Sequence, residues 1–457
     1  MPNPSNGGTN ERTGLLGGQE NGGPSHTSSF RQFFLDKRHT PGTESGNRFV
    51  RVPAQAFNVT KVTLFSNYVN VLLVFVPLGI VAGAMHWNPL TVFILNFFAI
   101  VPLAAVLSFA TEEISVKLGQ TMGGLLNATF GNAVELIVSI VALKNGEIRI
   151  VQSSMLGSIL SNILLVLGCC FLAGGIHNTR TGTASGIEQD FNSTVASTMS
   201  SLMAVASASL IIPATLYAAL SKSNADTEGN ILILSHGTAI ILLILYVLYL
   251  VFQLRTHATL FDAEQAAEDD DSEAEEAQMS PWAAAGVLVV VTLMVAICAE
   301  YLVDSIESVV ETAHISKTFI GLILLPIVGN AAEHVTAVVV ALKDKMDLAM
   351  GVAIGSSMQI ALLVTPFLVI LGWIMDIDMT LHFETFETVV FFLSVLVVTY
   401  VIQDGKSNYL EGAMLLGLYI IIALAFLVYP DDAVEGGGDP VSDPSMIVRS
   451  VKAMVGY

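Results

Sequence analysis

Two glutamates stand inside long apolar stretches, each in the same short motif. The motifs are "GNAVEL" at 131–136 and "GNAAEH" at 329–334. A charged side chain at the centre of a membrane costs about 2.5–3.5 kcal/mol on insertion scales. Neither motif has a Lys or Arg near it that could neutralise Glu135 or Glu333. We therefore expect each carboxylate to be neutralised by a proton or by a bound cation.

The other motif residues are suited to a hard cation. Gly131 and Gly329 let a helix open, and an opened turn exposes carbonyl oxygens. Asn132 and Asn330 add amide oxygens. Together with two carboxylates, these groups meet the demand of Ca²⁺ for six to eight oxygen ligands. They include no soft ligand, which argues against zinc or copper. One divalent cation or two protons would leave the charge of the site nearly unchanged, which is a chemical basis for exchange.

The motifs belong to an internal repeat with an offset of 198 residues. The same offset carries Gly157-Ser158 onto Gly355-Ser356, so each glutamate is followed by Gly-Ser in the next apolar segment. The second motif lies five predicted spans after the first. Because five is odd, the second copy would enter the membrane from the opposite side. Inverted repeats of this kind are typical of secondary transporters.

Polar side chains in the segments after each motif are expected to hydrogen-bond the carboxylates and orient them. These supporting residues are Ser158, Ser161, Asn162, Ser356, Ser357 and Gln359. A competing interpretation is helix packing, with Gly for close approach and Asn and Ser as interhelical glue. Packing accounts for these residue types, but it does not account for two glutamates, so we prefer an ion site.

The elements that must position the motifs are transmembrane helices. The chain has 457 residues, of which 53% are hydrophobic and 13% charged, and its mean hydropathy is +0.68. Soluble domains carry about 25% charged residues. Apolar runs of roughly 20 residues, the length that spans a bilayer, recur along the chain. We predict an all-α polytopic membrane protein with about eleven transmembrane helices. The predicted spans are 64–84, 89–116, 121–143, 150–174, 193–220, 229–252, 282–306, 317–342, 347–372, 384–402 and 409–429.

The predicted organisation is two inverted five-helix repeats with an extra N-terminal helix. Its parts are a disordered cytosolic tail (1–60), the extra first helix (61–86), the first repeat (87–254), an acidic cytosolic linker or helix (255–281), the second repeat (282–430) and a C-terminal tail (431–457). With the N-terminus in the cytosol, 13 Lys and Arg residues lie inside and 6 outside. Cys169, Cys170 and Cys298 are read as small core residues rather than a disulfide framework or metal cluster.

The stretches "GNAVELIVSIVAL" (131–143) and "GNAAEHVTAVVVALKDKMDLAMGVAIGSSMQIALLV" (329–364) resemble the Ca²⁺/H⁺ antiporters of the cation/proton exchanger family, in the calcium/cation antiporter superfamily. The resemblance covers about residues 62–429. Eleven spans and a central acidic segment make the chain similar to the vacuolar exchangers of fungi and plants.

The resemblance implies that Glu135 and Glu333 alternately bind Ca²⁺ and protons, with the Gly and Asn of each motif completing the site. Gln359 and the nearby serines would be supporting polar groups. It also implies Ca²⁺ export from the cytosol across the vacuolar membrane, driven by lumenal acidity. With the Lys and Arg distribution above, the expectation is a multi-pass protein with a cytosolic N-terminus. The partners would be Ca²⁺, protons and the lipid bilayer, with no nucleic acid. Mn²⁺ as a second cargo and a homo-oligomer are left open.

Three other functions are alternatives to Ca²⁺/H⁺ exchange: exchange against Na⁺ or K⁺, an intramembrane enzyme and a channel. An exchanger that couples Ca²⁺ to Na⁺ or K⁺ fits the same residue pattern. An intramembrane enzyme is disfavoured, because no His-Glu-x-x-His motif exists and the "GGGD" at 436–439 lies in the tail. A channel is disfavoured because a duplicated, inverted motif is typical of alternating access. We expect no resident cofactor.

Further acidic residues could line or gate the ion path. Glu112 and Glu113 end the second span, and Glu300 corresponds to them in the repeat. Glu112 and Glu300 are preferred as pathway residues, whereas Glu113 is equally compatible with a helix end in water. Asp304 extends a stripe from Glu300 that continues through Glu307 and Glu311, and such a stripe could attract cations. For the last two, a solvated face is the preferred interpretation.

His334 directly follows Glu333 and points about 100° away from it around the helix. Because histidine titrates near neutral pH, it could relay protons, and a packing histidine is the open alternative.

An acidic block lies between the two repeats. Its residues include Glu268, Asp269, Asp270, Asp271, Glu273, Glu275 and Glu276. It lacks the spacing of an EF-hand loop, and runs of like charge are usually solvated linkers. Because the block separates the two repeats, we prefer a regulatory role that senses or concentrates Ca²⁺.

Overall fold

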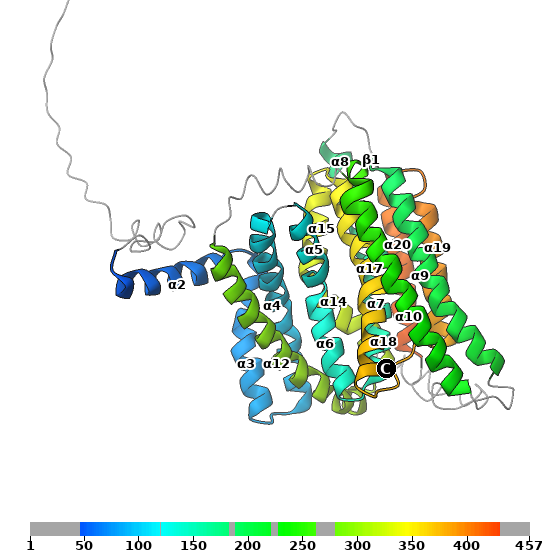
Figure 1. Ribbon diagram of the computed structural model, residues 1–457, viewed down its shortest axis with the longest axis horizontal. Coiled ribbons are helices and arrows are strands. Elements are labelled where there is room, and N and C mark those ends of the chain that lie inside the picture. Colours follow the sequence, from blue (N-terminus) through cyan, green and yellow to red (C-terminus); the bar gives the residue numbers. More distant parts are fainter. Residues whose placement is uncertain (1–45, 119, 182–187, 221–226, 262–278, 430–457) are drawn as a thin grey trace, which may run out of the picture. The chain divides into compact units, whose positions relative to one another are not determined.

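A computed structural model describes residues 46–118, 120–181, 188–220, 227–261 and 279–429 (Figure 1). The chain forms two compact units, Met1–Lys61 and Val62–Tyr457. Nearly all described residues are helical. The acidic block and both predicted tails, apart from residues 46–60, lie outside the described residues.

The elements before the acidic block are α2 (Arg48–Leu64), the 3-10 helix η1 (Tyr68–Val74), α3 (Phe75–Ala84), α4 (Pro89–Leu118), α5 (Gln120–Phe130), α6 (Ala133–Lys144), α7 (Ile148–Leu160), the π-helix η2 (Ser161–Val166), α8 (Leu167–Thr181), β1 (Gln189–Asp190), α9 (Ser193–Leu220), α10 (Thr227–Val251), the π-helix η3 (Phe252–Thr256) and the 3-10 helix η4 (Ala258–Leu260).

The elements after the block are α12 (Pro281–Ala313), α13 (Lys317–Phe319), the π-helix η5 (Ile320–Leu324), α14 (Leu325–Gly329), α15 (Ala331–Leu342), α16 (Met346–Met350), the π-helix η6 (Gly351–Gly355), α17 (Ser356–Gln359), the π-helix η7 (Ile360–Val364), α18 (Thr365–Ile374), α19 (Thr385–Val401), β2 (Lys406–Ser407) and α20 (Tyr409–Leu427). Strands β1 and β2 pair antiparallel, with Gln189 opposite Ser407.

The helices lie where the apolar runs predicted them. All eleven predicted ranges contain helix. In the described part of the chain, seven helices are long and apolar enough to cross a membrane, or up to nine if two broken pairs each count as one span. Thr385–Val401 is a shorter apolar helix. The predicted span 121–143 is split into α5 and α6, and each of these helices is too short to cross a membrane alone. The number eleven therefore stays a prediction.

The prediction of a disordered tail through residue 60 is wrong for its last part, because α2 begins at Arg48. The tail is polar on average, but this segment places Phe49 and Phe57 among basic residues such as Arg51. An amphipathic helix with basic and aromatic side chains is typical of segments that lie on a membrane surface. Averaging the composition over 60 residues concealed this local pattern.

Two ends of the helical unit Val62–Tyr457 are identified by hydrogen bonds of the described turns. At one end, Gln189 Nε2 donates to Asp344 Oδ1 at 2.8 Å, in the turn between α15 and α16. At the other, Asn145 Nδ2 in the α6–α7 turn donates to Asp304 Oδ1 at 2.8 Å. We call these the α15–α16 end and the α6–α7 end; in Figure 1, α15 lies toward the top and α6 runs below it.

Two glycines bring the chain halves into backbone contact beside the motifs. A Cβ at Gly157 of α7 would collide with the backbone of Leu322 in η5, and a Cβ at Gly321 would collide with the Ser153 side chain. Glycine therefore permits α7 and η5 to touch, as small residues do in membrane helix interfaces. Cys170 and Cys298 are fully buried, which confirms their prediction as core residues, whereas Cys169 is half-buried.

A buried ion pair joins α7 to α19 at the α6–α7 end. Both terminal nitrogens of Arg149 bond the Glu387 carboxylate, with Nη1 at 3.0 Å from Oε2, and Nη2 also donates to Thr318 Oγ1 at 3.3 Å. The Glu387 side chain is fully buried. We expect Glu387→Gln to lower the free energy of unfolding by about 3–5 kcal/mol, because Arg149 would keep a buried charge without a counter-ion. Chemical unfolding of the purified protein in detergent measures this loss.

The matched control is the exposed pair Lys406–Glu188, whose Nζ–Oε2 distance is 3.0 Å. Glu188→Gln should leave unfolding unchanged, because exposed ion pairs contribute little. Equal stability of the two variants would contradict the role given to Arg149–Glu387.

Candidate ion-binding site

Each glutamate motif interrupts its helix. The chain leaves helical geometry between α5 and α6 at Gly131 and Asn132, and between α14 and α15 at Asn330. The segments Lys317–Gly329 and Ala331–Leu342 are bent by 59° relative to each other. The prediction of a helix break at each motif is confirmed, and the role of the opened turns as a source of carbonyl ligands stays a prediction. Asn132 and Asn330 occupy the N-cap positions of α6 and α15.

The break places both glutamates in the first turn of a new helix. Glu135 lies in the first turn of α6 and Glu333 in the first turn of α15. The first turn carries backbone N–H groups without helical partners and the positive end of the helix dipole. A carboxylate is more stable there than in a continuous membrane helix.

The two motifs meet, and each carboxylate reaches the glycine of the other motif. A Cβ built on Gly329 would lie 2.8 Å from Glu135 Oε1, and a Cβ built on Gly131 would lie 3.6 Å from Glu333 Oε1. Glycine at these positions leaves room for the opposite carboxylate. Residues 198 apart in the chain thus contribute to one polar centre.

Several polar atoms of this centre are buried without a partner among the described residues. They are Glu135 Oε1, Glu333 Oε2 and Asn330 Nδ2. More than nine in ten buried polar groups in proteins are hydrogen-bonded, so a cluster of unsatisfied atoms marks a place for a ligand. In the described part of the chain, no three His, Cys, Asp or Glu residues are grouped to hold a metal. A Ca²⁺ ion here would need amide, hydroxyl, carbonyl or water oxygens beside the two carboxylates.

The supporting residues contact Asn132, and one of them, Ser356, also hydrogen-bonds the Glu333 carboxylate, as the sequence predicted. Asn132 Nδ2 donates to Gln359 Oε1 at 2.7 Å, and Ser356 Oγ donates to Asn132 Oδ1 at 2.9 Å. Asn162 Nδ2 donates to Ser356 Oγ at 3.1 Å. An amide both donates and accepts, so Asn132 satisfies two partners that a carboxylate, which only accepts, could not. These hydrogen bonds fix Asn132 at the start of α6, and the position of Glu135 in the first turn of this helix follows from it.

The remaining predicted supporting residues contact groups other than Asn132. They are Ser161, Ser357 and Ser158. Ser161 Oγ lies 3.4 Å from His334 Nε2, a contact that leaves both interpretations of His334 open. Ser357 Oγ donates to Ala353 O within its own segment at 2.9 Å. Ser158 is buried and lines a cavity beside Glu135. Ser357 Oγ also lies 3.5 Å from Ile159 O of α7, so this side chain bonds its own segment and reaches the facing helix.

Removing the acceptor of Asn132 should weaken ion binding. Gln359→Leu would leave the buried Asn132 Nδ2 without a partner, at a cost of about 1–3 kcal/mol. We expect the Ca²⁺ concentration for half-maximal transport to rise about tenfold. The control is Ser207→Ala on α9, where the hydroxyl donates to Ala204 O of its own helix at 2.9 Å. An unchanged Ca²⁺ dependence in Gln359→Leu would show that the network does not position the site.

The paired glutamates Glu112 and Glu113 near the end of α4 differ in burial, and the pathway role of Glu112 stays a prediction. Glu113 is buried, and its Oε2 accepts the backbone N–H of Met279 at 2.9 Å, whereas Glu112 is exposed. Adjacent residues on a helix point about 100° apart, so only one of the pair could face the packed side. Glu113 is the buried one because the chain just before α12, at Met279, packs against its side of α4.

The acidic stripe on α12 is exposed and pairs with the α6–α7 turn and α13. Glu300 Oε1 lies 3.9 Å from Lys144 Nζ, and Glu307 Oε1 lies 3.8 Å from Lys317 Nζ. Asp304 accepts the Asn145 bond described above. These contacts place Glu300 and Asp304 at the α6–α7 end, away from the two carboxylates.

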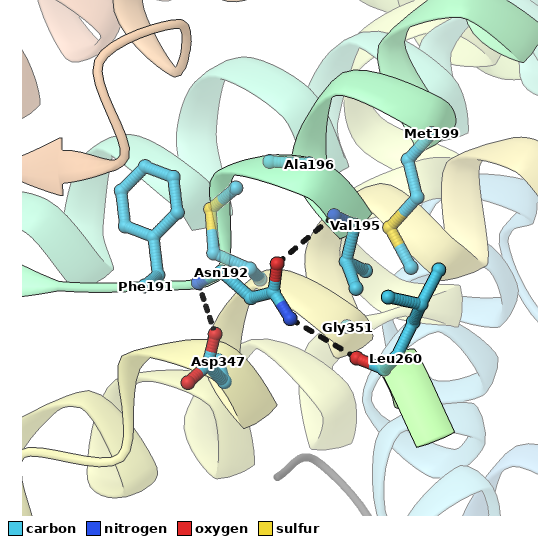
Figure 2. A pocket seen from close by; sticks show the side chains of 9 residues that line it. Phe191, Asn192, Val195, Ala196, Met199, Leu260, Asp347 and Gly351 are labelled. Carbon is cyan, nitrogen blue, oxygen red and sulfur yellow. Dashed lines mark hydrogen bonds between the residues drawn. The ribbon is translucent and has the colours of Figure 1, made fainter. Parts of the chain in front are cut away.

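A second pocket lies at the α15–α16 end, and its polar groups are satisfied (Figure 2). Asn192 N donates to Asp347 Oδ1 at 2.6 Å, and Asn192 Nδ2 donates to Leu260 O at 3.0 Å. Asn192 Oδ1 also caps α9 by accepting from Val195 N at 3.3 Å. The pocket is a junction that ties α9 to η4 and α16.

Sequence reasoning overlooked Ser139. It follows Glu135 by four residues on α6, is almost fully buried, and lines the same cavity. The one available signal was its i+4 spacing from the glutamate, which places both side chains on one helix face.

The broken apolar helices and the oxygen-rich centre between them define a polytopic membrane protein of the ion-exchanger class. Residues 88–255 and 283–428 match the family described as sodium/calcium exchanger protein, and the chain belongs to this family. It is 53% identical over 372 residues to a vacuolar calcium ion transporter of Schizosaccharomyces pombe, covering 81% of this chain and 87% of the relative. It is 43% identical over 389 residues to vacuolar cation/proton exchanger 3 of Oryza sativa, covering 84% and 90%.

A solved structure of native YfkE has the same fold. It matches with a TM-score of 0.66 and 37% identity, over 79% of this chain and all of that one. A second structure of YfkE, described as a Ca²⁺/H⁺ antiporter protein, matches with a TM-score of 0.62. The resemblance inferred from the two motifs is confirmed.

Proposed function

We propose that the protein is a secondary antiporter that moves Ca²⁺ across a membrane in exchange for protons. The observation that carries the proposal is the meeting of Glu135 and Glu333, each against the other motif's glycine and each with an unsatisfied oxygen. Buried carboxylates in such a centre are stable only when neutralised. Two protons and one Ca²⁺ neutralise the pair equally, so release of one cargo favours binding of the other.

Alternating access is the proposed mechanism. Helix α6 runs from the centre to the α6–α7 end and α15 runs from the centre to the α15–α16 end (Figure 1). These opposite directions support an inverted repeat, and we propose two five-helix repeats after an extra first helix. In such transporters one repeat rocks against the other around a fixed midplane site. The proposal involves neither covalent chemistry nor a resident cofactor.

We propose a vacuolar location, with the N-terminus in the cytosol and export of Ca²⁺ from the cytosol into an acidic lumen. The names of relatives, a vacuolar calcium ion transporter and vacuolar cation/proton exchangers, support the vacuolar location. The Lys and Arg count of 13 to 6 supports the cytosolic N-terminus. With this orientation the α15–α16 end faces the cytosol and the α6–α7 end faces the lumen. Regulation by the acidic block remains a proposal drawn from its sequence position.

Exchange against Na⁺ or K⁺ is the alternative. Carboxylate and amide oxygens bind any hard cation, so the donor set does not decide between these ions and protons. The relatives named Ca²⁺/H⁺ antiporter, 44% identical in Aphanothece halophytica and 45% identical in Synechocystis, favour protons.

Reconstituted vesicles test the proposal. The purified protein is placed in vesicles with an acidic interior, the membrane voltage is clamped with ionophores, and ⁴⁵Ca²⁺ uptake is measured. We expect uptake that requires the pH gradient and proceeds without Na⁺ or K⁺ gradients. Uptake that requires Na⁺ or K⁺ and ignores the pH gradient would refute proton exchange.

A further inference from the structure

A cavity next to Glu135 contains two serines, Ser139 and Ser154, that the proposed ion site does not use. It is bounded by α4, α6, α7, α12 and α14, and its polar lining residues are Glu135, Ser139, Ser154 and Ser158. Ser139 is 1% exposed, and its Oγ has no hydrogen-bond partner in the described ranges. The Glu135 Oε1 atom in the same cavity is also unsatisfied. Ser154 Oγ, by contrast, donates to Val151 O at 3.0 Å.

The cavity lies on the side of Glu135 that leads to the α6–α7 end. Ser139 precedes Gly146 by seven residues and Ser154 follows it by eight, so both lie about 11 Å from the turn along their antiparallel helices. Glu135 is one helical turn deeper on α6. Polar side chains thus line the first helical turn from the carboxylate toward this end of the molecule.

The other half of the protein lacks two of these hydroxyls. The offset of 198 residues places Ala337 opposite Ser139 and Val352 opposite Ser154. Ala337 is fully buried. Of the three cavity serines, only Ser158 has a hydroxyl counterpart in the second half, Ser356, so the hydroxyls of Ser139 and Ser154 belong to the first half alone.

We propose that this cavity is a hydrated passage that carries protons between Glu135 and the α6–α7 end, with Ser139 as the relay group nearest the carboxylate. A buried water needs two to four polar partners, and Glu135 with the three serines supplies them. In each transfer the Ser139 hydroxyl accepts a proton from water on one side and donates its own to the carboxylate, so it ends unchanged. The inference rests on the proposed proton exchange and deepens it.

A matched pair of substitutions isolates the hydroxyl. Ser139→Thr and Ser139→Val add side chains of nearly equal volume, but only threonine keeps the hydroxyl. In pH-driven vesicle uptake, we expect the maximal rate of the valine variant to fall at least about tenfold below that of the threonine variant. The half-saturating Ca²⁺ concentrations should agree within about twofold, because Ca²⁺ binding does not use the passage.

Ca²⁺/Ca²⁺ counterflow provides the readout that a structural defect would change. It needs no proton movement, so both variants should exchange ⁴⁵Ca²⁺ at similar rates. Ser394→Ala is the control, since this buried hydroxyl donates to Val390 O of its own helix at 2.8 Å. Equal pH-driven rates for the two Ser139 variants, or loss of counterflow in the valine variant alone, would overturn the passage. Wild-type uptake that ignores the pH gradient would instead refute the proposed function.

Discussion

Glu135→Gln and Glu333→Gln should each reduce pH-driven Ca²⁺ uptake by about 100-fold or more. Glutamine keeps the shape and one oxygen of glutamate, but it can neither carry the negative charge that balances Ca²⁺ nor take up a proton. Truncating a buried, charge-assisted interaction costs about 2–5 kcal/mol, and every 1.4 kcal/mol is tenfold in binding. Initial rates of ⁴⁵Ca²⁺ uptake in vesicles, normalised to protein, measure the loss.

Folding has to be separated from transport in this experiment. Each variant removes a buried charge, so we expect its thermal unfolding temperature to equal or exceed that of the wild type. Glu307→Gln is the matched control, because the Glu307 side chain is 73% exposed on α12 and lies outside the polar centre. Robust pH-driven uptake by either site variant would refute the assignment of the two carboxylates.

Gly329→Ala should also abolish uptake, although it changes no charge. The new Cβ would lie 2.8 Å from Glu135 Oε1, closer than Cβ atoms approach other heavy atoms, so the carboxylate would have to move. A misplacement of about 1 Å can cost about 100-fold in activity. The control is Gly237→Ala on α10, where a Cβ has no heavy atom within 4 Å and alanine favours the helix. Uptake assays on both variants make the comparison.

A compensating change sharpens the second prediction. The double variant Gly329→Ala with Glu135→Asp shortens the carboxylate by one methylene and returns space to the new methyl group. We expect it to transport faster than Gly329→Ala alone. A double variant no more active than Gly329→Ala would indicate that the glycine serves the helix break rather than the opposite carboxylate.

The local features of the site could be predicted because they depend on neighbouring residues. A Gly-Asn pair inside an apolar run weakens the helix where it stands, and the structure breaks both helices there. A glutamate three residues after the break falls in the first turn whatever packs around it. The apolar runs located the helices for the same reason, since the hydrophobic length of a segment is a property of that segment alone.

The contacts between segments could not be predicted in the same way. The sequence did not show that Gln359 and Ser356 would bond Asn132, because this requires α17 to pack against the break between α5 and α6. It did not decide between Glu112 and Glu113, because helical phase has meaning only against a neighbour. Ser139 looked like any other polar residue in a membrane helix until the cavity beside it was known.

By itself, the sequence determined the chemistry of this protein: an apolar helical chain, two helix breaks, and two carboxylates that need a proton or a cation. The tertiary structure alone decided the geometry, since it set each carboxylate against the other motif's glycine and placed a cavity lined by serines beside Glu135. The physical reason is that composition sets what a group can bind, whereas its partners depend on packing between segments some 200 residues apart in the chain.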